Sequence, residues 1–181
     1  MKTERLIKRC IKGERKSQKQ FYETYCDVLY AVVLRYCNNK EESEDVLLQA
    51  FLKIFEALQH LRYINEMAFI GWLKKIVINE ALLEKRKKLR QLYKVEFDND
   101  CNNISYANAD DYSEDELIEF VNRLPEGYRT VFLMYVVDGY SHKEIAIALD
   151  ISENTSRSQF FKARKLLRKI ITGDNERKSG T

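Results

Sequence analysis

The sequence predicts an all-α protein built from two small helical domains. Only one proline and six glycines occur in 181 residues, so few positions force a helix to end. Apolar residues recur at intervals of three and four on both sides of residues 96–116, a segment with acidic residues and no basic ones. Because 45% of the residues are hydrophobic, each half can bury a core of its own.

The first half predicts three long amphipathic helices behind a basic, weakly amphipathic lead-in over residues 2–19. The apolar spacing predicts helices from residue 21 to about 38, from 43 to about 60 and from about 67 to 90. A polar loop, residues 62–66, separates the last two helices. These three helices are expected to pack into one domain.

Three residues of this half carry specific expectations. Ser43 is expected to lead into the second helix, and Val28 is expected on the buried side of the first. The spacing of Trp72 with Phe69 and Ile76 favours a position in the core for the tryptophan.

The acidic, asparagine-rich segment between the halves favours turns and coil over a packed element, because it contains little apolar surface to offset chain entropy. We therefore expect it to be mobile. The expected limits are residues 1–92 for the first domain, 93–112 for an acidic flexible linker, 113–173 for the second domain and 174–181 for a disordered tail.

The second half contains a predicted helix-turn-helix. Ser141 can cap a short helix, with Glu144 three residues later as its capping-box partner, and Ser152 can cap the next helix. Only Asp150 and Ile151 lie between the two predicted helices. This layout of two capped helices joined by a tight turn is typical of DNA-binding proteins.

One side of the second helix in this motif is polar and basic. A solvated charged face is the simpler interpretation of such a helix, but its position after a capped short helix favours contact with DNA. Side chains of the first turns are expected to contact base edges, and those nearer the C-terminus, such as Arg168, are expected to contact phosphates. Phe161 either touches a thymine methyl group or packs against another helix. The expected DNA contacts are Asn154, Thr155, Arg157, Ser158, Phe161, Lys162 and Lys165.

Metal binding, catalysis and membrane insertion are not predicted. The four cysteines have no C-x-x-C spacing and the chain has only two histidines, so no metal site or other cofactor is expected. No serine or cysteine is placed with an evident catalytic base, so no nucleophilic catalysis is expected. Without a signal peptide or a long apolar run, the protein is expected to be soluble and cytoplasmic. The net charge of +3 is modest, so a nucleic-acid surface must be local.

Several motifs together resemble the sigma-70 family of RNA polymerase sigma factors, and specifically its extracytoplasmic-function (ECF) type. In the second half they are L-P-E-G-Y-R-T-V-F-L-M-Y (residues 124–135), D-G-Y-S-H-K-E-I-A (138–146) and A-R-K-L-L (163–167). In the first half they are F-Y-E-T-Y (21–25), E-D-V-L-L-Q-A-F-L-K-I-F (44–55) and F-I-G-W-L-K-K-I-V-I-N-E-A-L (69–82).

The resemblance implies a non-enzymatic protein that directs core RNA polymerase to promoter DNA. The second helix of the first domain is then expected to contact the beta-prime subunit through Asp45, Leu48 and Gln49. The first domain is expected to open the −10 promoter element, and the second to read the −35 element with the residues given above. The expected −10 contacts are Arg62, Tyr63, Asn65, Lys74, Lys75, Asn79 and Arg86. The beta subunit and an anti-sigma factor are further expected partners.

The sequence departs from the family pattern at two places. Leu48-Gln49 stands where the family usually has a Gln-Glu pair, and Asp150 stands in a turn where glycine is common. Aspartate tolerates a left-handed backbone better than most residues, so the turn is expected to form. The alternative function is a helix-turn-helix regulator that binds DNA without contacting polymerase.

Overall fold

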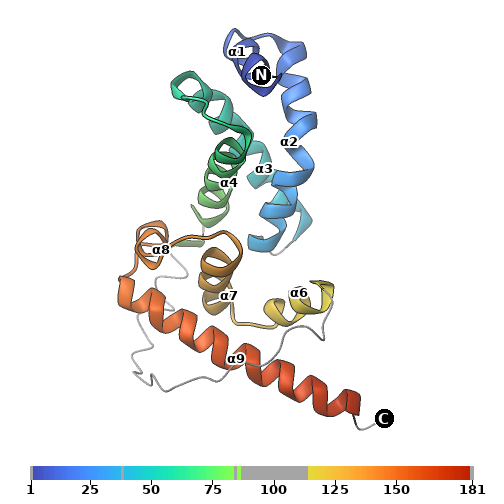
Figure 1. Cartoon of the computed structure of the whole chain (residues 1–181), viewed down its shortest axis with the longest axis vertical. Helices are drawn as coiled ribbons and strands as arrows, with labels where there is room; N and C mark the ends of the chain where they lie inside the picture. The colour runs from blue at the N-terminus through green and yellow to red at the C-terminus, as the bar shows by residue number, and fades with distance from the viewer. Residues whose placement is uncertain (1, 38, 84, 87–113, 180–181) are drawn as a thin grey trace. The chain divides into compact units, whose positions relative to one another are not determined.

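The computed structural model describes residues 2–37, 39–83, 85–86 and 114–179, and every regular element in them is a helix (Figure 1). The chain divides into two compact units, Met1–Lys85 and Arg86–Thr181. The expected linker, residues 93–112, lies outside the described residues. The prediction of an all-α protein with two helical domains is confirmed.

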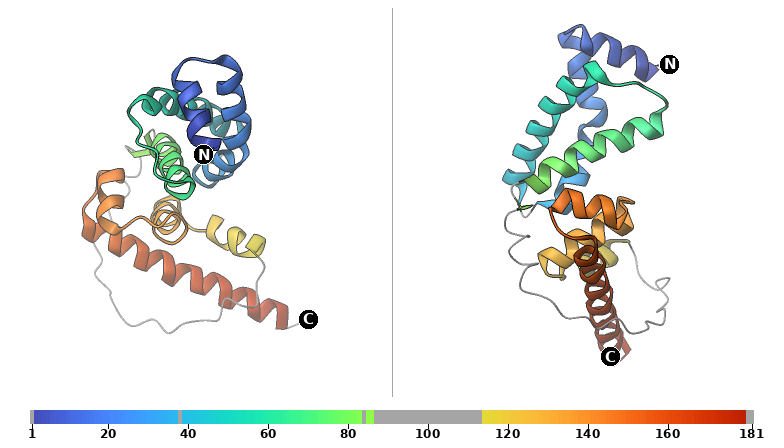
Figure 2. Two further views of the ribbon diagram at one scale, coloured as in Figure 1. Left: turned by 45° about the horizontal axis from the view of Figure 1, so that its top comes forward. Right: turned by 90° about the vertical axis from the view of Figure 1, so that its left-hand side faces the viewer.

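The first unit is a three-helix bundle with a fourth helix packed at one end. It contains α1 (Lys2–Ile11), α2 (Arg15–Tyr36), α3 (Lys40–Ala57), a short 3-10 helix η1 (Leu58–His60) and α4 (Glu66–Leu83). Helices α2, α3 and α4 all pack on one another, and α1 packs on α2 (Figures 1 and 2).

Aromatic side chains from all three long helices form the centre of this bundle. Phe21 of α2 is fully buried, and its ring centroid lies 6.5 Å from that of Phe51, 5.5 Å from that of Phe55 and 6.1 Å from that of Phe69. Rings at these separations and tilted geometries add about 0.5–1.5 kcal/mol per pair beyond the burial of their area. This cluster therefore fixes α3 and α4 against α2.

The start of the chain differs from the expected lead-in. Residues 2–11 form a complete helix whose Ile7 and Cys10 are buried, and Gly13 ends it with φ of 76°. Helix α2 then begins six residues before Phe21, at Arg15. This helix is more strongly amphipathic than expected, because Ile7 and Cys10 lie three residues apart on the side that is buried when α1 packs on α2.

Two other expectations for the first unit, those for Ser43 and Val28, are wrong, and the core position expected for Trp72 is met only in part. Helix α3 begins at Lys40, capped by Asn39, whose Oδ1 accepts the Glu42 N–H at 2.8 Å, and Ser43 lies buried within the first turns. Val28 is 49% exposed. Trp72 is only half-buried, stacked on Phe69 with 5.7 Å between ring centroids.

The second unit places three short helices and a π-helical turn against one long helix. It contains α6 (Glu114–Asn122), α7 (Glu126–Phe132), the π-helical turn η2 (Leu133–Val137), α8 (His142–Leu149) and α9 (Glu153–Ser179). Helices α6, α7 and α8 all contact α9 (Figure 2). Met134, Ile145, Leu149 and Ala163 lie in its core with at most a trace of exposed surface.

Helix α9 continues to Ser179, so it includes residues 174–179, which were expected to belong to a disordered tail. The backbone of these residues is helical. The run R-K-L-L-R-K-I-I before them is rich in good helix formers, and no proline follows it. Gly173, a residue type that often ends a helix, does not adopt a positive φ here, so α9 continues past it.

The two helices of the helix-turn-helix are capped by the predicted residues. The Ser141 hydroxyl accepts the Glu144 N–H at 3.2 Å, and the Glu144 carboxylate accepts the Ser141 N–H at 2.9 Å. Asp150 adopts the left-handed conformation, with φ 55° and ψ 49°. The Ser152 hydroxyl then accepts the Thr155 N–H at 2.9 Å at the start of α9.

Candidate nucleic-acid and partner interfaces

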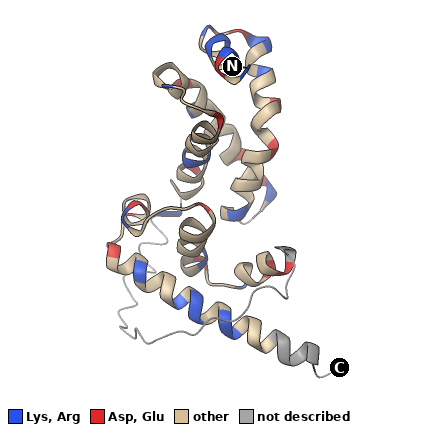
Figure 3. Ribbon diagram, viewed as in Figure 1, with Lys and Arg blue, Asp and Glu red and all other residues tan. Residues whose placement is uncertain are grey.

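Helix α9 has one buried side and one polar side along its first four turns. Ser156, Gln159 and Ala163 are buried, whereas Asn154, Arg157 and Lys165 are exposed. The half-buried residues on and between these faces are Thr155, Ser158, Phe160, Phe161, Lys162, Arg164, Leu166, Leu167, Arg168 and Ile170. Lysine and arginine recur along the helix (Figure 3). All seven expected DNA contacts therefore retain exposed surface.

Arg157 already has a partner within the helix. Its Nη2 donates to Glu153 Oε1 at 2.6 Å, and the two side chains are 61% and 44% exposed. This is a surface ion pair one helical turn long, which stabilises a helix by about 0.3–0.5 kcal/mol. The guanidinium can exchange this weak contact for a stronger one.

A histidine contact that the sequence did not reveal joins α8 to α9. His142 Nδ1 lies 2.9 Å from Ser156 Oγ, and its ring stacks on Tyr135 with 4.4 Å between centroids and 16° between planes. Burial lowers the pKa of His142, the positive charge of Arg157 lowers it further, and Glu153 opposes this effect. The contact orients the first turn of α9 on α8.

The loop before α4 holds three expected −10 contacts in different ways. Arg62 is exposed. The Tyr63 hydroxyl donates to Glu66 at 3.2 Å and its ring meets Phe69 edge-on at 5.8 Å, while Asn65 Oδ1 accepts the Ala68 N–H at 2.8 Å and so caps α4. Tyr63 and Asn65 thus have structural contacts of their own.

Helix α4 brings only part of the remaining set together. Lys75 and Asn79 are exposed and lie one turn apart, and Lys74 is half-buried beside them. Arg86 lies beyond α4, at the first residue of the second unit. The structure also exposes two apolar residues that the sequence analysis did not single out, Ile64 at 74% and Met67 at 86%.

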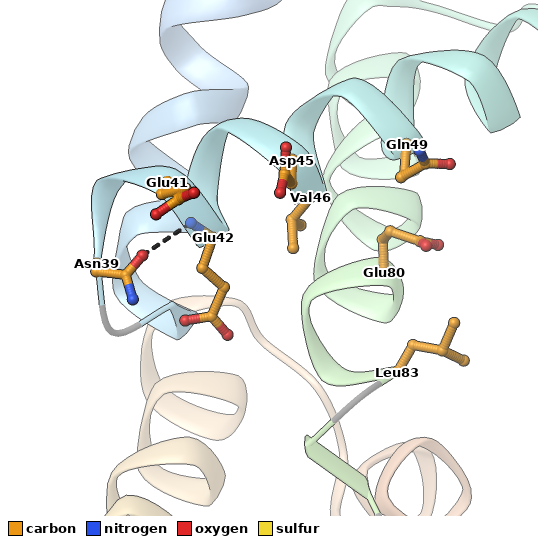
Figure 4. Close-up of a pocket in the computed structure, with 8 residues that line it drawn as sticks. All are labelled: Asn39, Glu41, Glu42, Asp45, Val46, Gln49, Glu80 and Leu83. Carbon is orange, nitrogen blue, oxygen red and sulfur yellow. Dashed lines mark hydrogen bonds between the residues drawn. The ribbon is translucent and has the colours of Figure 1, made fainter.

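The surface of α3 that carries Asp45 forms one wall of an open groove. Asp45 and Gln49 line it, and Glu80 and Leu83 of α4 line the opposite side (Figure 4). The groove has a volume of about 390 Å³ and is also lined by Asn39, Glu41, Glu42 and Val46. Leu48 does not line it but is 56% exposed. Four carboxylates line this groove, and one of them, Glu80, is paired with Lys53 of α3 at 2.5 Å. The groove is therefore acidic mainly along the wall that α3 forms.

Two family models match the chain, one in its first half and one in its second half. The model described as Sigma-70 region 2 matches residues 21–91, and the model described as Sigma-70, region 4 matches residues 114–167. The chain belongs to the sigma-70 family. In this sigma factor the region 2 match includes most of α2 and all of α3 and α4, and the region 4 match includes α6, α7, α8 and the first half of α9.

Curated relatives identify the type of sigma factor. The chain is 25% identical to the RNA polymerase sigma-H factor of Pseudomonas aeruginosa over 181 residues, covering 93% of each chain. It is 26% identical to the ECF RNA polymerase sigma-E factor of Escherichia coli K12 over 175 residues, covering 90% of each. This sigma factor is of the ECF type and is not an enzyme, as predicted. The alternative of a regulator that acts without polymerase is therefore set aside.

A solved structure has the same fold. The sigma factor RpoE of Bartonella quintana, determined in complex with the anti-sigma factor NepR, matches with a TM-score of 0.52 and 19% identity, covering 85% of this chain and 96% of that one. Within the part of this chain that the structure describes, no helix has the length and apolarity needed to cross a membrane, and no cluster of potential ligands could hold a metal ion.

Proposed function

We propose that this ECF sigma factor binds core RNA polymerase through α3, opens the −10 promoter element with residues 62–66 and α4, and reads the −35 element with α9. The observation that carries the proposal is that the expected contact surfaces on α3, on α9 and on the loop of residues 61–65 with α4 are accessible, and that each of these helices is fixed by its buried side to the core of its own unit. Rigid helices are suitable supports for recognition, because little order has to be imposed when the partner binds.

The acidic groove favours a basic partner segment at α3. Asp45 and Gln49 lie one turn apart on its wall, and Glu80 faces them from α4 (Figure 4). Leu48 and Leu52, also one turn apart, are 56% and 53% exposed next to this wall. A partner helix with basic and apolar side chains would match both features. We assign this role to the beta-prime subunit, with the beta subunit as a further partner.

The first turns of α9 are suited to base readout. Arg157 can donate two hydrogen bonds to one guanine, and Asn154 can pair with adenine in the same bidentate manner. Lys162 and Lys165 lie further along the helix, where a helix leaving the major groove meets phosphates. Phe161 is half-buried, which is compatible with contact to a thymine methyl group as well as with packing.

The −10 role rests on the loop and on α4. Arg62, Lys75 and Asn79 are exposed and offer hydrogen-bond donors to a DNA backbone, while Tyr63 and Asn65 hold the loop to α4. Arg86 and Lys74 remain proposed contacts to phosphates. Ile64, with its high exposure, adds an apolar surface for an unstacked base.

The proposal includes the domain limits and the cellular context. The proposed limits are residues 1–92 for the first domain and 93–112 for the linker, with the second domain beginning at residue 113 and including α9 to Ser179. An ECF sigma factor acts where polymerase and promoters are, so we place this one in the cytoplasm. An anti-sigma factor is a proposed regulatory partner.

Transcription from a randomised promoter library tests the proposal. Core RNA polymerase is combined with the full-length protein, and the transcribed templates are sequenced. The expected result is a set of templates that share two short elements separated by a constant spacing, absent when core polymerase is used alone. Transcription that does not depend on the protein, or templates without a shared upstream element, would contradict it.

A further inference from the structure

One carboxylate in the first unit accepts hydrogen bonds from three hydroxyl groups. Glu66, the first residue of α4, accepts from Thr3 Oγ1 at 2.5 Å, from the Tyr25 hydroxyl at 2.9 Å and from the Tyr63 hydroxyl at 3.2 Å. The three donors come from α1, from α2 and from the loop of residues 61–65. Glu66 therefore connects α1, α2 and this loop to the start of α4.

The hydrogen bonds that Glu66 accepts favour its ionised form. The hydrogen bond from Thr3 lowers the pKa of Glu66 most, those from Tyr25 and Tyr63 lower it further, and burial opposes them. Burial raises the pKa of Tyr25 to about 12, and its contact with Glu66 adds to this effect. The group is thus an ionised acceptor with neutral donors, and hydrogen bonds to an ionised group are about twice as strong as those between neutral groups. Glu66 is exposed and only its bond from Tyr25 is partly buried, so water reduces this gain for the bonds from Thr3 and Tyr63.

The loop that this carboxylate holds has alternating exposure. Leu61 and Tyr63 are half-buried, whereas Arg62 and Ile64 are exposed. Tyr63 is fixed by its hydroxyl on Glu66 and by its ring on Phe69, 5.8 Å between centroids. Fixing Tyr63 in the middle of the loop directs its two neighbours outward.

We infer that Glu66 is a positioning residue for −10 recognition, which holds the loop in its DNA-binding conformation through contacts with Thr3, Tyr25 and Tyr63. The inference rests on the proposed role of this loop. Ordering a loop residue costs about 1–2 kcal/mol of backbone entropy, and a loop that is ordered before binding avoids this cost when DNA arrives. Helix α1 contributes to promoter choice in this way without touching DNA.

Three variants remove single members of the cluster and leave the aromatic core in place. Thr3→Val and Tyr25→Phe each remove one hydroxyl group, and Glu66→Gln removes the charge of the acceptor. The matched control is Thr24→Val, because the Thr24 hydroxyl donates to the Gln20 carbonyl within α2, away from the cluster.

The assay uses holoenzyme reconstituted from core RNA polymerase and the full-length protein. One probe is a pool of DNA fragments with a preformed bubble of randomised sequence at the −10 position, and the second is fully paired DNA with the selected −35 element. We expect Thr3→Val, Tyr25→Phe and Glu66→Gln to weaken binding of the selected bubble by roughly three- to tenfold and to broaden its base preferences. Binding of paired −35 DNA and of core polymerase should stay at the level of Thr24→Val.

The possible results separate this inference from the proposed function. If the parent holoenzyme selects a −10 sequence and the three variants bind it with unchanged affinity and preference, the inference is wrong and the proposed function stands. Equal losses for bubble DNA, paired −35 DNA and core polymerase would also overturn it, because they would reflect a general loss of folding, which thermal unfolding would detect. If the parent holoenzyme selects no −10 sequence, the proposed function itself fails.

Discussion

Replacing Arg157 with alanine is expected to relax the choice of one base in the −35 element. A bidentate contact between arginine and guanine contributes about 1–3 kcal/mol of discrimination. Arg157 gives up its ion pair with Glu153 when it makes this contact. The two side chains of the pair are largely exposed, so the pair contributes only about 0.3–0.5 kcal/mol. The DNA contact is therefore the larger effect, and Arg157→Ala should weaken binding of the preferred sequence on the order of 5- to 150-fold.

The same two energies predict the effect of replacing Glu153. Glu153→Gln releases Arg157 from its ion pair, so binding of the preferred sequence should strengthen by about twofold. In the double variant this gain should disappear, because there is no guanidinium left to release. The coupling between the two changes then measures the competition between Glu153 and DNA for Arg157.

Selection on a library of paired DNA with a randomised −35 element measures both effects. The parent holoenzyme and the two single variants are compared by the sequences they select and by their affinity for the parent's preferred sequence. The reasoning is refuted if Arg157→Ala selects the parent's sequence with the parent's stringency. An equal gain from Glu153→Gln with and without Arg157 would show that the carboxylate acts only through its charge near DNA.

Three further predictions concern other surfaces. Lys165→Ala should weaken binding to all sequences alike and reduce the slope of log K against log salt by roughly one unit, as seen in a salt titration. Asp45→Ala should weaken binding to core polymerase by about 1 kcal/mol or more, measured by competition, whereas Glu56→Ala, an exposed α3 carboxylate outside the groove, should not. The pKa of His142 is lowered in the folded state, mainly by burial, so the unfolded state binds the proton more readily and stability should fall as the pH drops from 6.5 through the lowered pKa. Urea unfolding over this pH range should show that the free energy of unfolding falls, and that this fall is absent in His142→Gln. If His142→Gln has the same pH profile as the parent, the fall belongs to other groups.

Local signals in the sequence predicted the helix-turn-helix in detail. Ser141 and Glu144 form the expected capping box, and Asp150 adopts the expected left-handed conformation, because caps and tight turns depend on residues within one helical turn. The start of α3 was misplaced for the same kind of reason. Asn39 and Ser43 are both good capping residues, and Asn39, with Glu42 three residues later, is the one that caps the helix.

Residues whose role depends on tertiary contacts could not be predicted. Gln159 is polar and only 2% exposed, and no pattern in the sequence distinguishes it from the polar residues on the outer face of α9. The contact between His142 and Ser156 joins residues 14 positions apart in different helices, and Glu66 contacts Thr3, 63 positions away. The acidic groove likewise needs α3 and α4 side by side. Single-sequence patterns report which side of a helix is apolar, but not which side chains meet there.

The left-handed backbone at Asp150 has a consequence for the chirality of the chain. Among the described residues other than glycine, it is the only position with a positive φ. This conformation costs an L-residue roughly 1–2 kcal/mol, whereas it is the preferred one for a residue of opposite handedness. A protein assembled by chemical ligation with D-alanine at this position would keep the turn without that cost, and, unlike glycine, would not enlarge the conformational freedom of the unfolded chain. The direction in which α9 leaves α8 therefore depends on the backbone conformation of one residue, and a D-amino acid adopts that conformation more readily than an L-amino acid.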